Sequence, residues 1–214
     1  MNGQRWLPGL GARCVLAALA LGWLVAGCGG GVGSGGTGSF ASGPITGFGS
    51  IVVGGVHFDE SAARIENDDG TPRDRGALHL GTMVEIDSDE IRGDAATASQ
   101  VRITSALIGA VESVAADSLV ANGLTVRIEA GIVFDERFAG GLAGVAIGRV
   151  VEVHGFVGAG STGIVATRIE PNDGATAFKF RGEVAALDTQ ARTFDIGGQH
   201  FSYGASFPGA GELR

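Results

Sequence analysis

Short runs in which apolar and polar residues alternate, separated by glycine-rich turns, fill the chain from about residue 44 onward. In 84–86 and 151–153, aliphatic residues flank a single glutamate. This alternation is typical of a strand with one face in the core and the other outside it. Three dipeptides that favour two-residue hairpins lie between such runs: Gly54-Gly55, Asn122-Gly123 and Gly197-Gly198. The pattern predicts an all-β fold containing three hairpins.

The hairpins belong to a longer pattern that repeats along the chain. A glycine-led Val-Glu element follows the first two hairpins at nearly the same distance, at Gly81 and at Gly148, and each copy then closes with Arg-Ile. Repetition at this spacing indicates a duplicated supersecondary unit, and small sheets avoid open edges by closing. We therefore expect tandem small β-barrels, OB-like or similar and closed or semi-closed, with repeats over 44–106 and 107–178 and a partial repeat over 179–214.

The repeat also indicates whether residues 103–116 form a helix or strands. Residues 103–116 would suit an amphipathic helix if taken alone, because apolar residues recur near one helical face. The corresponding stretch of the first copy contains Gly47, Gly49 and a β-branched run at 51–53, which disfavour a helix. We expect strands in all copies, and we interpret the short third copy as a truncated product or one completed by strands from another molecule.

The N-terminus carries an export signal. Arg5 and Arg13 precede an apolar run at 15–25, which is too short to span a bilayer but typical of a secretory signal helix. The run ends in Val-Ala-Gly-Cys at 25–28, which resembles the lipobox of bacterial lipoproteins. This resemblance implies a signal peptide over 1–27, cleavage between Gly27 and Cys28, and a lipid on the Cys28 thiol. An ordinary signal peptide or an uncleaved helix are the alternatives.

Residues 28–43 are mostly glycine, serine and threonine, a composition that buries little apolar surface. We expect a flexible tether between the anchor and the first barrel. Gly29 stands where an aspartate would resemble an inner-membrane retention signal. The expected location is therefore the outer membrane, with the protein facing the periplasm.

The charge balance excludes one class of partner. The formal net charge is −8, and removal of the signal would take away two arginines and make the chain more acidic still. The remaining basic residues are scattered rather than clustered, so a phosphate backbone would be repelled. We expect no nucleic-acid partner. The expected partners are the membrane, through lipidated Cys28, and an envelope protein or glycan.

Several of these elements also resemble one protein family. The opening phrase at 45–53, the Gly-Gly turn, the Val-Glu-Val element and the closing Ala-Thr-Arg-Ile at 166–169 are similar to the bacterial domain-of-unknown-function family 5666, found in exported lipoproteins. The resemblance extends over nearly everything after the tether. It implies no known activity, cofactor or site residue.

Motifs that could carry chemistry are weak. The glycines at 158–163 fit the dinucleotide pattern Gly-x-Gly-x-x-Gly, but a strand-like run follows them, whereas the motif needs a helix N-terminus. The same pattern occurs by chance at 31–36. A serine nucleophile elbow would need a glycine at Ala159. Phosphate binding and serine hydrolase chemistry are therefore not favoured.

Metal ligands do not converge in the sequence either. His57 and His200 occupy equivalent repeat positions, whereas His79 and His154 do not, and no His-x-x-x-His spacing occurs. The acidic turns at 68–70 and 87–90 lack the spacing of a calcium loop. Glu85 and Glu152 lie in different copies and are expected to face water, so they do not predict a glycosidase pair. We expect no catalytic residue, no cofactor and no metal.

The sequence thus predicts a lipid-anchored protein of the cell envelope that acts as a binding or scaffolding module and is not an enzyme. Tandem repeats on a tether present similar surfaces at high local concentration, which suits multivalent binding. One alternative is a small-molecule or glycan site in a barrel mouth. The other is a hydrolytic enzyme, which would require titratable groups that meet in one cleft.

Overall fold

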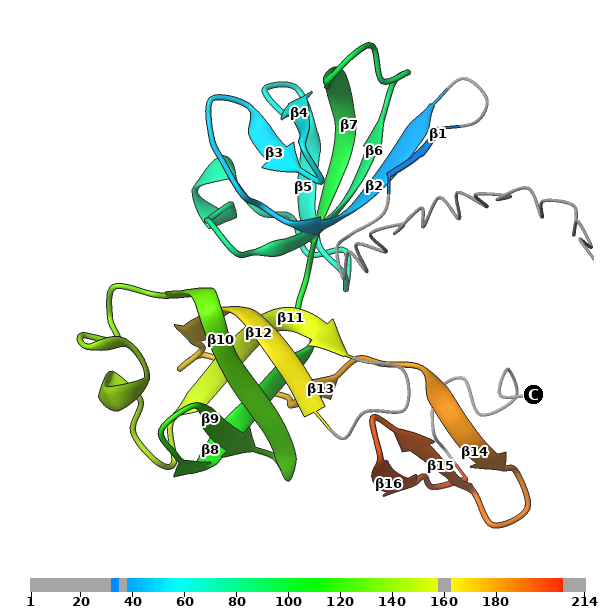
Figure 1. Ribbon diagram of the computed structural model, residues 1–214. Helices are drawn as coiled ribbons and strands as arrows, with labels where there is room; N and C mark the ends of the chain where they lie inside the picture. Colours follow the sequence, from blue (N-terminus) through cyan, green and yellow to red (C-terminus); the bar gives the residue numbers. More distant parts are fainter. Residues whose placement is uncertain (1–31, 35–37, 158–162, 206–214) are drawn as a thin grey trace, which may run out of the picture.

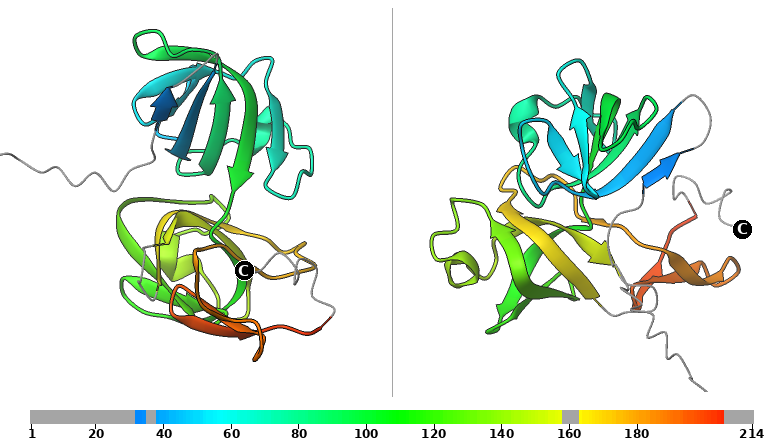
Figure 2. Two further views of the ribbon diagram at one scale, coloured as in Figure 1. Left: turned by 90° about the vertical axis from the view of Figure 1, so that its right-hand side faces the viewer. Right: turned by 45° about the horizontal axis from the view of Figure 1, so that its top comes forward.

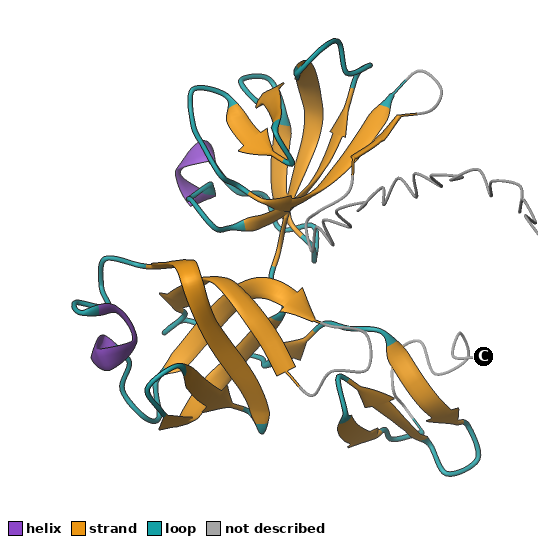
Figure 3. Cartoon of the chain, in the orientation of Figure 1, coloured by secondary structure: helices purple, strands orange, loops and turns teal. Residues whose placement is uncertain are grey.

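The computed structural model describes residues 32–34, 38–157 and 163–205. In these ranges the chain forms strands and two short 3-10 helices, arranged as two barrel-like units and a smaller sheet (Figures 1 and 3). None of the helices in these ranges has the length and apolar character that crossing a membrane requires. The predicted signal peptide, its cleavage site at Gly27 and the lipidation site Cys28 lie outside the described residues. The all-β prediction is confirmed.

The strands of the first unit are β1 (Val32–Ser34), β2 (Ser39–Pro44), β3 (Ile51–Val53), β4 (Val56–Asp59), β5 (Arg64–Asn67), β6 (Met83–Ser88) and β7 (Ala95–Thr104), with the 3-10 helix η1 (Arg75–Ala77) before β6. Their hydrogen-bonded order is β1-β2-β6-β7-β4-β3, and β5 also pairs with β7. Strands β4 and β5 run parallel to β7 in succession. A bridge between Gly47 and Val52 joins the segment after β2 to β3, so the sheet curls toward closure.

The second unit is a closed five-stranded barrel. Its strands are β8 (Leu107–Val114), β9 (Ser118–Ala121), β10 (Leu124–Phe134), β11 (Val150–Val157) and β12 (Gly163–Pro171), with the 3-10 helix η2 (Gly141–Gly144) before β11. The order is β11-β12-β10-β9-β8, and the pairing of β11 with β8 closes the ring. Only the β10–β12 pair is parallel among these strands. The predicted small barrel with about five strands is confirmed here.

The third sheet continues from the second unit. It contains β14 (Val184–Asp188), β15 (Thr193–Ile196) and β16 (Gln199–Ser202), and the short strand β13 (Lys179–Phe180), which precedes it, belongs to the sheet of the second unit. Strand β13 pairs with β8 of the barrel, and the other three form an antiparallel meander. The rings of Phe180, Phe201 and Phe194 stack in a row, with centroids 6.1 Å and 5.5 Å apart. Because Phe180 lies on β13, which pairs with β8, this row connects the meander to the barrel edge. Figure 2 shows the orange and red strands of the meander beside the barrel.

The three predicted hairpins form at the expected dipeptides. Both central residues have positive φ in each turn: 60° and 83° at Gly54-Gly55, 47° and 75° at Asn122-Gly123, and 57° and 79° at Gly197-Gly198. Two positive φ values match the right-handed twist of the flanking strands, and glycine and asparagine tolerate them best. Residues 103–116, whose pattern would also suit a helix, form strands as predicted: β7 ends at Thr104 and β8 begins at Leu107.

Alternation places the core residues as the sequence predicts. Phe58, Val84 and Ile86 are fully buried in the first unit, and Val151 and Val153 are fully buried in the second. Each unit has its own apolar cluster, and the two clusters share no residue. The two units therefore carry separate cores, as expected for barrels that each close around their own interior.

The expectation of a tether over 28–43 is wrong at its C-terminal end. Strand β2 begins at Ser39 and pairs with β6 over six residues, and Ala41 is fully buried. Backbone hydrogen bonds hold this strand in place, and they do not depend on side-chain size. Small side chains therefore concealed a strand that composition alone assigned to a linker.

A second correction concerns the opening phrase of the first unit. The sequence predicts a strand from Gly47, but residues 48–50 form a turn and β3 begins only at Ile51. Gly49 has a φ of 128°, which few other residues adopt. Phe48 lies in this turn and is consequently 56 % exposed.

Candidate functional site

The two units meet at a junction where polar contacts, an ionic network with a buried histidine, and two clefts lie close together. Only Ser105 and Ala106 separate β7 from β8. Across the junction, the hydroxyl of Thr167 donates to the carbonyl of Gly81 at 2.6 Å. Lys179 pairs with Asp68 of the first unit and also donates to Ser105 at 2.9 Å. The junction is therefore held by specific polar contacts as well as by the short connection.

Gly81 is positioned so that only glycine fits. Its φ is 79°, and a Cβ there would overlap the carbonyl oxygen of Thr167 in the other unit. We expect Gly81→Ala to lower the free energy of unfolding by about 2–3 kcal/mol, because backbone strain and steric overlap act together. Gly93→Ala is a matched control, since Gly93 also has positive φ, 68°, but has open space around it. Urea unfolding of both variants measures the difference, and an equal loss in both would contradict the packing role of Gly81.

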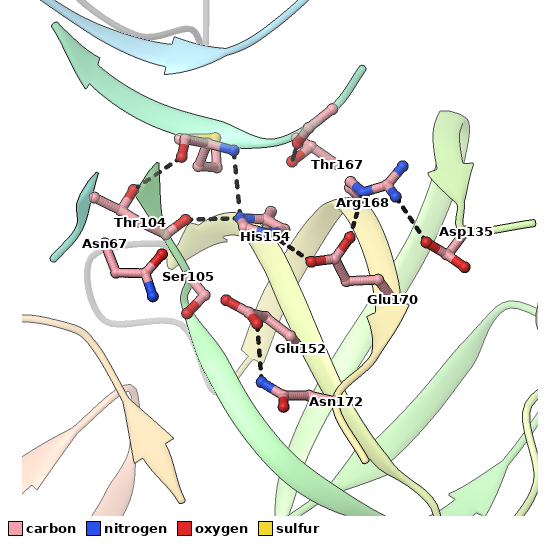
Figure 4. A network of polar contacts seen from close by, with 12 residues as sticks. Asn67, Thr104, Ser105, Asp135, Glu152, His154, Thr167, Arg168, Glu170 and Asn172 are labelled. Carbon is pink, nitrogen blue, oxygen red and sulfur yellow. Dashed lines mark hydrogen bonds and ion pairs between the residues drawn. The ribbon is translucent and has the colours of Figure 1, made fainter. Parts of the chain in front are cut away.

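A buried ionic network lies on the second unit beside this contact (Figure 4). Arg168 of β12 donates from Nε to Glu170 at 2.9 Å and from Nη2 to Asp135 at 3.1 Å. Asp135 also receives the Nε of Arg137 at 2.7 Å. The Arg168 side chain is only 6 % exposed. Since buried charges are tolerated only when they are paired, each member of this network depends on the others.

His154 of β11 links the network to the first unit. Its ring is 1 % exposed, and Nδ1 lies 2.7 Å from the carbonyl oxygen of Thr104. A carbonyl only accepts, so Nδ1 carries the proton, and the amide of Met83 at 3.4 Å from Nδ1 is then a packing neighbour. The other nitrogen, Nε2, faces Glu170 at 3.8 Å.

The carboxylates of the network are held in their charged form. Burial by itself would raise the pKa of Glu170, but the contacts with His154 and then with Arg168 outweigh burial and lower the pKa to about 2. Hydrogen bonds from the side chain and backbone of Arg137 lower the pKa of Asp135. Both carboxylates therefore favour the folded state at neutral pH and lose this contribution in acid.

This lowered pKa predicts acid sensitivity. The folded pKa of Glu170 is about 2 and its ordinary value is 4.5, so its contribution is complete above about pH 4.5 and disappears as the pH falls through about 2. The contribution amounts to about 3 kcal/mol at neutral pH. We expect Glu170→Gln to flatten the stability profile between these pH values, measured by urea unfolding. Exposed Glu90→Gln is the control, and equal profiles for the two variants would contradict the assignment.

A cleft of about 690 Å³ lies beside the junction, outside both barrels. One wall is the outer surface of β10, β11 and β12, where Ile132, Phe156 and Val165 are exposed to the cleft. The other wall comes from the first unit, at residues 44–46 and at Leu80, which is 42 % exposed. A volume in this range and a mostly apolar lining are typical of small-molecule sites.

An irregularity in β10 shapes the cleft. The parallel ladder between β10 and β12 shifts register between Ile128 and Val133, so residues 129–132 have no partner in β12. Gly131 in this bulge has a φ of 93°. A bulge of this kind redirects side chains and often lies at a functional site. Here it turns the segment toward the cleft, because all four bulge residues line it.

Two charged side chains line the cleft, Arg127 and Glu129. Both are exposed residues of β10, and within the described part of the chain neither has an ion pair or a hydrogen bond. The two threonine hydroxyls of the lining are already engaged, since Thr46 donates to Val52 and Thr167 donates to Gly81. Within the part of the chain that the structure describes, the cleft therefore offers apolar walls, one unpaired cation and one unpaired anion.

A smaller polar cleft of about 250 Å³ lies on another side of the junction. Its lining carries charges of both signs, from Arg73, Asp74, Asp135, Arg137 and Glu170. Three of these, Asp135, Arg137 and Glu170, belong to the network of Figure 4 or are bound to it. This cleft is therefore the solvent-exposed edge of the ionic network.

The histidines do not gather into one site. His57 contacts the hydroxyl of Ser50 at 3.4 Å, and His200 pairs with Asp195 at 2.8 Å in the third sheet. His79 lies on the rim of the smaller cleft. Among the described residues, no group of three or more His, Cys, Asp or Glu side chains is arranged to hold a metal ion.

The acidic turns have local structural roles. Asp69 accepts the amide of Thr71 at 2.8 Å, and Asp89 accepts the amide of Thr97 at 2.7 Å. Glu85 and Glu152, expected to face water, are only partly exposed. Glu85 pairs with Arg102 and with Arg181, a residue beyond the second barrel, which covers this surface. The expectation of solvated glutamates is therefore wrong for Glu85.

The glycine motif at 158–163 lies outside the described residues except for its last position. Gly163 begins strand β12, so a strand follows the motif, as the sequence predicts. This geometry lacks the helix N-terminus that a dinucleotide site requires.

Sequence reasoning missed the junction network. Arg168 was noted only as a mark of the repeat, and His154 as a histidine without an equivalent. A signal was present, since both lie in strands that are otherwise rich in apolar residues, and a charged group there needs a buried partner. The partners come from different strands and loops, so the sequence does not indicate which groups meet.

Comparison with known families finds one match, which lies in the closed barrel. Residues 108–170 match the family described as Domain of unknown function (DUF5666). This DUF5666 match extends from β8 into β12 and includes His154, Arg168 and Glu170. It covers the second unit only, so the resemblance expected for nearly everything after residue 43 is confirmed for this part alone. No curated protein and no solved structure matches the chain.

Proposed function

We propose that the protein is a lipid-anchored binding module of the cell envelope whose ligand lies in the cleft between its two barrel units. The observation that carries this proposal is the cleft itself, with apolar walls from both units and two charged side chains that have no partner among the described residues. The charged groups of its lining are one arginine and one glutamate, which suits recognition better than acid–base hydrolysis.

Matching strand order supports a further part of the proposal, that the two units are copies of one module. In the first unit β2 pairs with β6, β6 with β7, β7 with β4, and β4 with β3. In the second unit β8 pairs with β11, β11 with β12, β12 with β10, and β10 with β9. The glycine-led elements at Gly81 and Gly148 precede β6 and β11, respectively. Tandem copies of a module create a cleft at each junction that neither copy has alone.

The anchor is proposed from the sequence. A short apolar run followed by Val-Ala-Gly-Cys at 25–28 supports acylation of Cys28 and an outer-membrane location facing the periplasm. Mass spectrometry of the protein from the membrane fraction tests this directly. We expect Cys28 to be acylated and to be the first residue, and we expect Cys28→Ser to release the protein from membranes. An unmodified Cys28 in membrane-bound protein would overturn the anchor.

The cleft is tested with a neutral photoactivatable alkyl probe on the full chain in membranes. We expect the probe to label peptides that contain Leu80, Ile132 or Phe156, which line the cleft. Val165→Arg puts a charge on the apolar wall and is expected to reduce labelling severalfold. Ile147→Arg is the matched control, because Ile147 is 69 % exposed and does not line the cleft. Labelling that is spread over the surface, or unaffected by Val165→Arg, would refute a ligand site here.

A further inference from the structure

We infer that the ligand of the cleft is a single-chain zwitterionic lipid, with its acyl chain between the two units, its phosphate on Arg127 and its ammonium group on Glu129. This inference rests on the proposed function of the cleft as a ligand site and adds the chemical class of the ligand. It is argued from the charges at the cleft, their spacing and the shape of the walls.

The two charges are suited to one ligand head group. Arg127 and Glu129 are two residues apart on β10, and both line the cleft. Arg127 is the last exposed residue before the bulge and Glu129 is its first residue, so the cleft receives both side chains at the point where the strand becomes irregular. Their side chains are long enough to reach adjacent groups of opposite charge, and neither has a partner among the described residues. A guanidinium binds a phosphate through two parallel hydrogen bonds, and a carboxylate accepts from an ammonium group.

Other ligand charges fit less well. A purely anionic amphiphile would bind Arg127 but would be repelled by Glu129 and by the net charge of −8. A purely cationic amphiphile would meet the opposite problem at Arg127. A neutral molecule would pair with neither charge while removing water from both, which costs free energy. A zwitterionic head group satisfies both side chains.

The walls favour a chain rather than a flat ring or a sugar. Most of the lining is aliphatic, from Ile45, Leu80, Ile132 and Val165, with Phe156 as its aromatic residue. Glycans are usually recognised through convergent hydrogen-bonding groups. The two hydroxyls present, on Thr46 and Thr167, already donate to backbone carbonyls. A flexible acyl chain needs only apolar surface, which this cleft supplies from both units.

The test uses the full chain in membranes and a photoactivatable lysophosphatidylethanolamine that carries its reactive group at the end of the acyl chain. Unlabelled competitors of equal chain length differ only in the head group: lysophosphatidylethanolamine, a fatty acid, an alkylamine and a monoacylglycerol. We expect labelling within the cleft, at peptides that contain Ile132 or Phe156. We expect the zwitterionic competitor to act at a concentration about fivefold lower than the others.

Variants of the two charges give the matched comparison. Arg127→Gln and Glu129→Gln are each expected to remove the fivefold preference while labelling persists. Both residues are exposed, so folding is preserved, and circular dichroism checks this. The double exchange Arg127→Glu with Glu129→Arg is expected to retain part of the preference, because both charges remain. Glu90→Gln and Arg92→Gln are controls, since this exposed pair has the same spacing and lies away from the cleft.

The outcomes separate the two proposals. Cleft labelling with equal competition by all head groups, or with best competition by the fatty acid, would overturn the zwitterionic lipid and leave the binding cleft intact. Unchanged preference in Arg127→Gln and Glu129→Gln would also overturn it. Absence of cleft labelling with this lipid and with the neutral probe would overturn both.

Discussion

Arg168→Met is expected to lower the free energy of unfolding by about 3–5 kcal/mol, because it leaves two partly buried carboxylates, whose side chains are 20 % and 11 % exposed, without their shared cation. Arg168 is 6 % exposed and binds Glu170 and Asp135 at 2.9 Å and 3.1 Å. Asp135 keeps Arg137, and Glu170 keeps His154, so we expect a value near the lower end. Methionine conserves much of the apolar volume, so the loss measures the missing charge rather than a cavity.

Two comparisons test this explanation in urea unfolding. Arg92→Met removes an arginine that is 84 % exposed, and it is expected to change stability by less than about 0.5 kcal/mol. Adding Glu170→Gln to Arg168→Met removes one carboxylate that has lost its arginine and is expected to restore about 1 kcal/mol or more. Similar losses for Arg168→Met and Arg92→Met, or no recovery in the double variant, would contradict a buried network that depends on pairing.

Phe58→Ala is expected to cost about 3–5 kcal/mol and to act mainly on the first unit. Phe58 is fully buried in strand β4 and belongs to an apolar cluster that shares no residue with the cluster of the second unit. Truncation removes a large apolar side chain and leaves a cavity that close-packed neighbours fill only in part. Hydrogen exchange should therefore show lost protection in β3, β4 and β7, with a smaller change in β8–β12.

The control is a second phenylalanine of the same unit. Phe48 lies in a turn and is 56 % exposed, so Phe48→Ala is expected to change stability by less than about 0.5 kcal/mol. If Phe58→Ala weakened protection equally in both units, the two cores would form one cooperative block. That result would mean that the junction transmits the full cost of unfolding from one barrel to the other.

The hairpins and the inward faces of the strands could be predicted because they depend on neighbouring residues. Asn122-Gly123 forms a tight turn through its own φ preferences, and Val151 and Val153 are inward because side chains alternate along a strand. The strand predicted from Gly47 is wrong at its start for a related reason. A glycine-rich opening phrase carries little periodicity, so neither the turn at 48–50 nor the start of β3 could be located.

Strand β2 shows where composition fails. Four of the five residues from Ser39 to Gly43 have small side chains, which assign the segment to a linker, yet β6 supplies a complete set of backbone partners. Such pairing is a long-range property, since β2 and β6 lie far apart in the chain. The local sequence of β2 therefore does not indicate which strand pairs with it.

What the sequence determined by itself is the strand content, the three tight turns and the inward faces of the strands, since each follows from residues within a few positions of one another. The tertiary structure alone decided the cleft and the ionic network at the junction. Gly81 meets Thr167, and His154 meets Thr104, only when two units fold and pack against each other. A site made by two surfaces depends on their relative placement, which short-range patterns do not encode.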